Sequence, residues 1–174
     1  MSGVTKLKPF LTEEQIASKV KELAAEINKD FGTEHFIAIG ILKGAFMFFA
    51  DLIRHIKAPL SIDFIISSSY VDTSTSGEVT IHSDIRADIA GKDVLLIEDI
   101  VDTGISLNKI RERILQKSPK TLKTCVLLDK KDRRIVDVPV DYTGFVIPDE
   151  FVIGYGVDYN DSYRNLPYIG ILKH

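Results

Sequence analysis

The sequence has few of the features that form disulfides, bind metals through histidine or anchor a protein in a membrane. Cys125 is the only cysteine among 174 residues, so no disulfide can form within the chain, and we expect the protein in the reducing cytoplasm. No stretch approaches the ~18 apolar residues of a membrane span, and residues 1–10 lack the apolar core of a signal peptide. The four histidines are scattered without the spacing of metal ligands. These absences argue against secreted proteins, membrane proteins and histidine-based metal centres.

An excess of positive charge is absent as well. The chain has 22 lysines and arginines against 25 acidic residues, a net charge of −3, whereas a nucleic-acid-binding protein normally displays a basic face. Hydrophobic residues make up 45% of the sequence, which is enough for a real core, and the length fits a single domain over residues 1–174. We therefore expect one domain that binds neither nucleic acid nor a membrane.

Hydrophobic periodicity predicts strands that alternate with helices. Thr12 and Gln15 fit a capping box, which opens a helix whose apolar residues fall on one face. These are Ile16, Val20, Leu23, Ala24 and Ile27. Strands are predicted over 36–40, 61–69, 79–82, 94–97, 121–128, 151–157 and 168–172, and further helices over 45–56 and 107–115. The alternation predicts an α/β fold, a mostly parallel twisted sheet flanked by helices.

The predicted helix over 45–56 is unusually apolar, since it carries Phe46, Met47, Phe48 and Phe49 in succession. We expect it to be covered on more than one side, as it would be at a subunit interface. The polar stretch 73–77 lies between two predicted strands, and this pattern predicts a mobile flap rather than a separate domain.

A hydroxyl-rich turn follows the most apolar strand. The run from Val94 to Ile97 is typical of a strand buried on both faces, and the turn that follows contains Thr103, Gly104 and Ser106 before a helical pattern begins. A helix N-terminus offers unpaired N–H groups, and a glycine lets the backbone approach closely, so a phosphate monoester fits this turn. For Ser106 alone, an ordinary N-cap is the favoured interpretation.

Glu98 and Asp99 precede this turn and cannot bind the same phosphate, because like charges repel. Adjacent carboxylates at a strand end can accept hydrogen bonds from the vicinal hydroxyls of a ribose, directly or through Mg²⁺, which prefers oxygen ligands. The whole stretch therefore predicts a sugar-phosphate site at the active edge of the sheet.

The stretch from Val94 to Leu107 closely resembles the signature of the purine phosphoribosyltransferases. Four other segments resemble further motifs of that family, in the same order and with the spacing of its hypoxanthine-guanine branch. These are Leu42-Lys43-Gly44, Ser69-Tyr70, Leu128-Asp129-Lys130, and 148–160 together with Tyr163-Arg164. The resemblance covers the chain from about Phe36 to Arg164 and implies the type I fold of the family, with a small hood from the N- and C-terminal segments and a mobile lid over about 69–80.

The resemblance implies a role for each segment. Lys43, Gly44 and Arg164 would bind pyrophosphate, with a cis peptide at Leu42–Lys43, and Arg134 would be a further contact. Glu98, Asp99, Thr103, Gly104, Ile105 and Ser106 would hold the phosphoribosyl group, while Glu98, Asp99 and Asp158 would bind Mg²⁺. Ser69 and Tyr70 would form the tip of the lid. Ile105 departs from the pattern, since some relatives have a lysine there, so the phosphate would rely on N–H groups and hydroxyls.

The base would be read by Lys130, Phe151, Val152 and Asp158. Phe151 can stack on a purine, Val152 offers main-chain groups to its edge, and Lys130 has only donors, which suit a 6-oxo group better than a 6-amino group. Without the other motifs, Phe151 would be interpreted as a core aromatic and Lys130 as a surface lysine.

The implied activity is transfer of the phosphoribosyl group of phosphoribosyl pyrophosphate to hypoxanthine or guanine, a purine salvage reaction, with Asp102 accepting or sharing the imidazole proton of the base. Family members are commonly homodimers or homotetramers. Orotate, adenine or xanthine phosphoribosyltransferases are alternatives within the family. A regulator that binds phosphoribosyl pyrophosphate or nucleotide is an alternative of another class.

Overall fold

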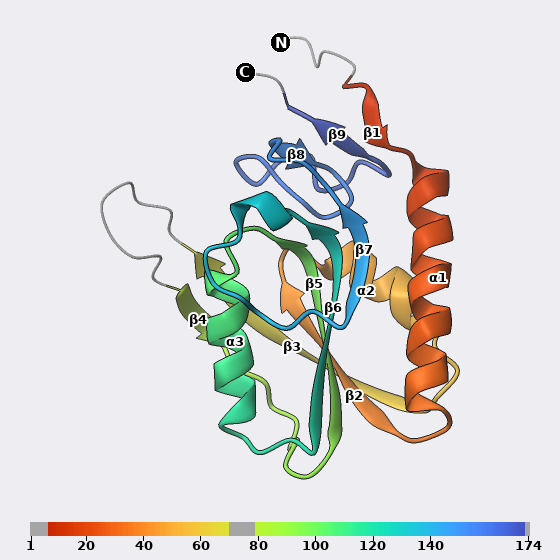
Figure 1. The fold of residues 1–174 in the computed structure, drawn as a ribbon, viewed down its shortest axis with the longest axis vertical. Coiled ribbons are helices and arrows are strands. Elements are labelled where there is room, and N and C mark those ends of the chain that lie inside the picture. Colours follow the sequence, from red (N-terminus) through yellow and green to blue (C-terminus); the bar gives the residue numbers. More distant parts are fainter. Residues whose placement is uncertain (1–6, 70–78, 173–174) are drawn as a thin grey trace.

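The computed structural model describes residues 7–69 and 79–172, and a six-stranded sheet runs through its centre (Figure 1). Its strands are β2 (Phe36–Leu42), β3 (Leu60–Ser69), β4 (Val79–Ser83), β5 (Asp93–Val101), β6 (Thr121–Asp129) and β7 (Tyr142–Val146). The order across the sheet is β4-β3-β2-β5-β6-β7, and every pair is parallel except β3 with β4. The predicted mostly parallel sheet is confirmed.

Helices cover both faces of this sheet, as predicted. The helices α1 (Glu13–Phe31) and α2 (Phe46–Ile53) lie on one face, and α3 (Ile105–Leu115) lies on the other (Figure 1). A one-turn 3-10 helix, η1 (Lys131–Arg133), follows β6. The capping box of α1 is present with both of its hydrogen bonds, from Gln15 N to the Thr12 hydroxyl and from Thr12 N to the Gln15 side chain.

Strand β5 is buried on both faces because its side chains alternate between two cores. Leu95 and Ile97 pack in the core beneath α1 and α2, while Val94 and Leu96 pack in the core beneath α3. All four side chains are fully buried. The continuous apolar run is thus the signature of a central strand, and it fixes the end of β5 between two covered faces.

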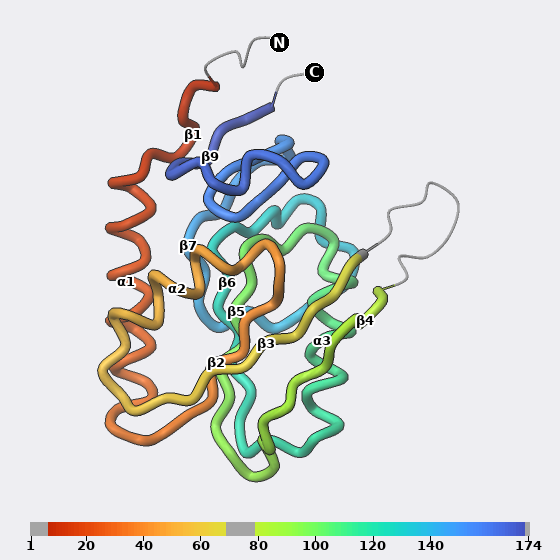
Figure 2. Tube along the Cα trace, turned by 180° about the vertical axis from the view of Figure 1, so that it is seen from behind, coloured from red at the N-terminus to blue at the C-terminus, as the bar shows by residue number. Residues whose placement is uncertain are grey.

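A second, smaller sheet joins the two ends of the described chain. It contains β1 (Pro9–Leu11), β9 (Ile169–Ile171) and β8 (Val152–Ile153), in that order and antiparallel throughout. We call this sheet, together with the loop 154–168, the hood. Figure 2 shows it above the carboxyl ends of the central strands, with β1 and β9 side by side.

Several boundaries differ from the sequence prediction, and the short strands β1 and β7 were not predicted. The predicted strand over 151–157 ends at Ile153, because Gly154, Tyr155 and Gly156 all have positive φ and turn the chain away. Strand β5 continues to Val101, so Glu98 and Asp99 lie on the strand itself. Helix α2 is shorter than predicted.

The expectation that α2 is covered on more than one side holds for only part of the helix. Phe48 and Phe49 are buried, but Phe46 is 43% exposed in the single chain. The helix begins at Phe46, and a short turn separates it from Gly44.

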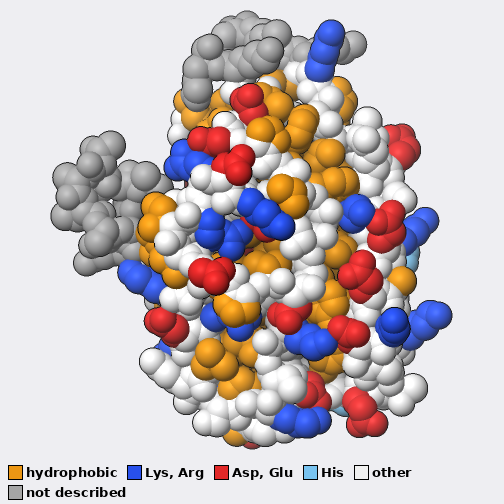
Figure 3. All heavy atoms as spheres, viewed as in Figure 1, with side chains coloured by type: hydrophobic (Ala, Val, Ile, Leu, Met, Phe, Trp, Pro, Cys, Tyr) orange, Lys and Arg blue, Asp and Glu red, His pale blue; other side chains and the backbone are white. Residues whose placement is uncertain are grey.

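None of the described helices is both long and apolar enough to cross a membrane. On the face shown in Figure 3, basic and acidic side chains are interspersed and form no continuous basic patch. Tyr70 and most of the predicted lid lie outside the described residues, and Ser69 is placed only as the last residue of β3.

The packing of α3 gives a direct test of this architecture. Ile114 is fully buried in the core beneath α3, whereas its neighbour Leu115 is 51% exposed. We expect Ile114→Ala to lower the free energy of unfolding by about 2–5 kcal/mol, because it removes buried methyl groups and leaves a cavity. Leu115→Ala is the matched control and should cost less than about 1 kcal/mol in chemical denaturation. Equal losses would contradict the orientation of α3.

Candidate active site

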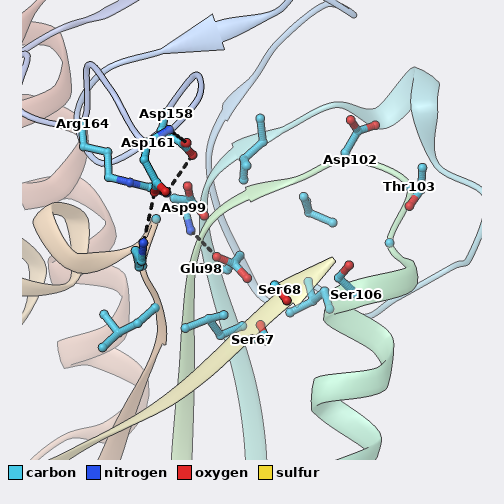
Figure 4. Close-up of a pocket in the computed structure, with 18 residues that line it drawn as sticks. Ser67, Ser68, Glu98, Asp99, Asp102, Thr103, Ser106, Asp158, Asp161 and Arg164 are labelled. Atoms are coloured by element: carbon cyan, nitrogen blue, oxygen red, sulfur yellow. Dashed lines mark hydrogen bonds and ion pairs between the residues drawn. The ribbon is translucent and has the colours of Figure 1, made fainter. Parts of the chain in front are cut away.

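A cavity of about 480 Å³ opens at the carboxyl ends of β2 and β5. This is where the connections leave the sheet toward opposite faces, the usual position of ligands in open α/β sheets. Figure 4 shows acidic side chains in the middle of the cavity, hydroxyls on one side and Arg164 on the other. The polar and charged side chains in its lining are Lys43, Ser67, Ser68, Glu98, Asp99, Asp102, Thr103, Ser106, Asp158, Asp161 and Arg164.

The hydroxyl turn has the geometry of an anion site. Gly104 has a φ of 84° at the N-cap of α3, a conformation that favours glycine, and a Cβ there would collide with the carbonyl oxygen of Val136. Because glycine has no side chain to cap α3, an external anion can take the place of a cap. The turn is fixed from behind, since Ile135 N and Val136 N both donate to Thr103 O, at 2.9 and 3.0 Å.

Glu98 and Asp99 form a crowded acidic pair at the end of β5. Burial, followed by the charge of the adjacent Asp99, raises the pKa of the Glu98 carboxyl well above its ordinary value. Asp99 is itself buried, at 7% exposure, and its carboxylate lies where a Cβ on Gly44 would have to be. Only glycine therefore lets the loop after β2 pass this close to the acids.

This acidic pair fits a divalent cation that keeps part of its own shell. Repulsion between the two carboxylates is relieved when a cation or several hydrogen-bond donors lie between them. Within the described residues, however, no three histidine, cysteine or acidic side chains gather into one metal-binding group. Mg²⁺, which usually keeps several waters and binds through one or two carboxylates and substrate oxygens, suits such an incomplete set.

The cationic side chains of the cavity are paired with acids of the hood. Lys43 Nζ lies 3.1 Å from Asp161 Oδ1, and the Arg164 guanidinium lies 2.8 Å from Asp158 Oδ1. Hydrogen bonds from Lys43 and Arg164 lower the pKa of the Asp161 carboxyl. Leu42–Lys43 is a cis peptide, as proposed from the sequence. The Lys43–Asp161 pair thus joins the loop after β2 to the hood, whereas the Arg164–Asp158 pair lies within the hood.

Backbone contact also joins this loop to the hood. Gly156 has a φ of 101°, and a Cβ there would collide with the carbonyl oxygen of Gly44. The neighbouring Tyr155 is buried, and its hydroxyl donates to Asp51 Oδ2 on α2 at 2.6 Å. Its burial and this hydrogen bond raise the pKa of the Tyr155 phenol. These contacts fix the hood against the segment that carries Lys43.

Of the four residues predicted to read the base, Asp158 lines this cavity, whereas Lys130, Phe151 and Val152 lie outside its lining. Lys130 is 7% exposed, and its ammonium lies 3.8 Å from Asp102 Oδ2. Phe151 is 41% exposed and meets Tyr159 edge to face at 5.6 Å, while Val152 is buried in the hood sheet. Asp102 lines the cavity and contacts Lys130, so it joins the two regions.

Several lining residues were missed by the sequence reasoning, and some candidates lie elsewhere. Ser67 and Ser68 belong to the polar end of β3, and Asp161 is the first residue after the segment 148–160. No sequence motif marks these three residues, and only their position in the cavity lining identifies them. Ile105 is absent from the cavity lining. Arg134 pairs with Asp129 behind the hydroxyl turn, so the structure does not place it with Lys43 and Arg164.

A comparison with protein families agrees with this arrangement. The model of the phosphoribosyl transferase domain matches residues 8–160. The chain therefore belongs to the phosphoribosyltransferase family, and the fold class expected from the resemblance is confirmed.

Individual relatives indicate which branch of the phosphoribosyltransferase family the chain resembles. The chain is 49% identical over 165 residues to the hypoxanthine phosphoribosyltransferase of Salmonella typhimurium, with 92% of each chain covered. It is 47% identical over 167 residues to the hypoxanthine-guanine phosphoribosyltransferase of Bacillus subtilis, covering 95% of this chain and 93% of the relative. A crystal structure of a hypoxanthine phosphoribosyltransferase from Staphylococcus aureus superposes with a TM-score of 0.93 at 47% identity, covering 99% of this chain and 96% of the other. The predicted resemblance to the hypoxanthine-guanine branch is confirmed.

The raised pKa of Glu98 predicts a pH-dependent effect on stability. The folded protein keeps this carboxyl protonated over a range above its ordinary value of 4.5, where the unfolded chain is ionised. The folded state then binds more protons, so Glu98 lowers the free energy of unfolding as the pH rises through that range. With a metal chelator present, Glu98→Gln should be more stable than the parent at pH 8, and the difference should vanish near pH 4.

Chemical denaturation at both pH values measures this effect. The exposed Glu34→Gln is the control and should change the free energy of unfolding by less than about 0.5 kcal/mol at either pH. A Glu98→Gln protein less stable than the parent at pH 8 would contradict the assignment.

Proposed function

We propose that this protein transfers the phosphoribosyl group of phosphoribosyl pyrophosphate to hypoxanthine or guanine, giving IMP or GMP and pyrophosphate. One observation carries the proposal. A single cavity at the ends of β2 and β5 is bordered by a hydroxyl turn, an acidic pair and two cations, the three chemistries that a phosphorylated sugar diphosphate requires. The names of the relatives, which are hypoxanthine or hypoxanthine-guanine phosphoribosyltransferases, support the same reaction.

In this proposal the substrate spans the cavity from one side to the other. Thr103, Gly104 and Ser106 receive the 5-phosphate at the N-terminus of α3, with the N–H of Ile105 at the same turn. Glu98 and Asp99 accept hydrogen bonds from the ribose hydroxyls, which relieves their mutual repulsion. The substrate therefore supplies positive or donor groups where the protein has only acceptors.

The diphosphate takes the other side, where Lys43 and Arg164 exchange partners. Both cations are paired with acids of the hood, Lys43 with Asp161 and Arg164 with Asp158, and in this proposal they exchange these carboxylates for phosphate oxygens. As the anomeric C–O bond breaks, negative charge grows on the leaving diphosphate, and these cations stabilise it. Arg164 is further steadied because it donates to Gly156 O at 2.7 Å.

Mg²⁺ is the cofactor of the proposed reaction: Glu98 and Asp99 would hold one ion on the sugar side, and Asp158 would hold a second ion, mostly through water, on the diphosphate side. When bound, it would neutralise charge on the diphosphate and so assist its departure. Asp158 is available for this only after Arg164 has turned toward the substrate, because the two side chains are paired.

The purine is placed beside Asp102 and under the hood. Lys130 donates to the 6-oxo group, the Phe151 ring stacks on the base, and main-chain groups near Val152 meet its edge. Asp102 accepts the imidazole proton of the base as its nitrogen bonds to the anomeric carbon. A donor-only lysine at this position favours oxopurines over adenine. Xanthine carries the same 6-oxo group and remains the alternative substrate.

A lid over residues 69–80 and a homodimer or homotetramer complete the proposal. A closing lid would protect a cation-like ribose from water. The exposed Phe46 and Ile62, at 43% and 51%, are the kind of apolar surface that a second copy would cover. The single Cys125 cannot form a disulfide within the chain, which is consistent with the proposed cytoplasmic location, and burial raises the pKa of its thiol.

The direct test mixes the protein with phosphoribosyl pyrophosphate and Mg²⁺ and adds each base separately. We expect IMP from hypoxanthine and GMP from guanine, with little product from adenine or orotate. Chromatographic separation of the nucleotides formed distinguishes these products. Binding of phosphoribosyl pyrophosphate without product from any base would favour the regulator instead and overturn the proposal.

The role of Asp102 predicts a large kinetic defect. General-base assistance is typically worth ~10²–10⁴-fold, so Asp102→Asn should lower kcat by about that factor while thermal stability changes little. Steady-state rates of IMP formation measure the loss. Asp132→Asn, on the exposed η1 turn, is the control and should keep nearly the full rate. A kcat of Asp102→Asn within about twofold of the parent would contradict the role.

A further inference from the structure

Four charged side chains form a closed ring beside the proposed base site. Two are acids, Asp102 and Asp149, and two are cations, Lys130 and Arg133, and each cation contacts both acids. They come from three elements, namely the turn after β5, the segment Lys130–Arg133 after β6, and the loop between β7 and β8. The ring carries two negative and two positive charges and is therefore balanced.

The two cations contact the acids at different distances. Arg133 Nε donates to Asp102 Oδ1 at 3.0 Å, and its terminal nitrogen lies 3.2 Å from Asp149 Oδ2. Lys130 Nζ lies 3.8 Å from both Asp102 Oδ2 and Asp149 Oδ1, which is beyond hydrogen-bonding distance. Arg133 thus makes the hydrogen bonds, while Lys130 is only attracted by charge.

The geometry fits the different chemistry of the two side chains. The guanidinium is a planar fork with donors in several directions, so one arginine can bridge two carboxylates. A lysine ammonium is a compact charge on a flexible stem and moves readily toward the nearest acid. Lys130 is also the more enclosed of the two, with its side chain 9% exposed against 46% for Arg133.

We propose that Arg133 is a positioning residue that engages Asp102 and Asp149 so that the donors of Lys130 stay available for the 6-oxo group of the purine. The inference rests on the proposed function, because it assigns a role to the partner of the base-reading lysine. Arg133 bonds Asp102 through Oδ1, so Asp102 Oδ2 keeps its capacity to accept a proton or a hydrogen bond.

Charge counting shows what removal of Arg133 would do. Without it, one ammonium faces two carboxylates, so Lys130 would be drawn into hydrogen bonds with Asp102 or Asp149. A purine would then have to break those bonds to gain its own. Exposed ion pairs contribute little to stability, so the principal effect should fall on base binding rather than on folding.

The first experiment measures KM for hypoxanthine and for phosphoribosyl pyrophosphate in Arg133→Gln. We expect KM for hypoxanthine to rise by roughly tenfold, with KM for phosphoribosyl pyrophosphate within about twofold of the parent, because only the base contacts Lys130. Lys131→Gln removes the same charge from the same turn and should leave both constants unchanged. Arg133→Lys keeps the charge without the fork and should recover part of the loss.

A second substitution separates positioning from a structural defect. Arg133→Gln combined with Asp149→Asn leaves one acid facing Lys130, so balance returns and KM for hypoxanthine should fall back to within about threefold of the parent. A structural defect would instead persist or worsen.

The outcomes distinguish this inference from the proposed function. If the parent protein is active but Arg133→Gln leaves KM for hypoxanthine unchanged, or if the double variant shows no recovery, only the role of Arg133 is overturned. Absence of IMP and GMP formation by the parent overturns both.

Discussion

The end of β5 is the constraint on which the site depends. The strand is apolar on both faces and lies between two cores, so Glu98 and Asp99 are carried to a fixed place at the edge of the sheet with little freedom to move apart. Burial, together with the charge of the adjacent Asp99, raises the pKa of the Glu98 carboxyl, and the pair of acids favours hydroxyl donors or a cation between them. The close passage of Gly44 past Asp99 ties the neighbouring loop to the same point.

Around this point, cations and acids lie together in pairs. Lys43 and Arg164 are paired with acids of the hood, and Lys130 lies beside two acids without bonding either. Such pairs keep flexible side chains near their working positions at small cost, because their strength in partly exposed sites is modest. The hood therefore does more than cover the sheet, since it supplies the counter-charges that position the cations.

How far the sequence predicted the fold depended on the strength of each pattern. The capping box at Thr12 and the apolar run before Glu98 are strong local signals, and both elements are found where they were expected. The prediction of a strand after Ile153 was wrong, because three successive residues there have positive φ although the segment is apolar. The exposure of Phe46 could not be predicted either, since hydrophobic periodicity does not show which side of a helix packs against its neighbours.

By itself, the sequence determined the alternating elements, the order of the motifs and the type of chemistry at each one, because these depend on local periodicity and on the functional groups present. Only the tertiary structure decided which charges meet. The pairing of Lys43 with Asp161 joins positions 118 residues apart, and the ring that places Arg133 between Asp102 and Asp149 joins three separate elements. Such contacts arise from packing of the hood and the loops against the sheet, and no spacing along the chain encodes them.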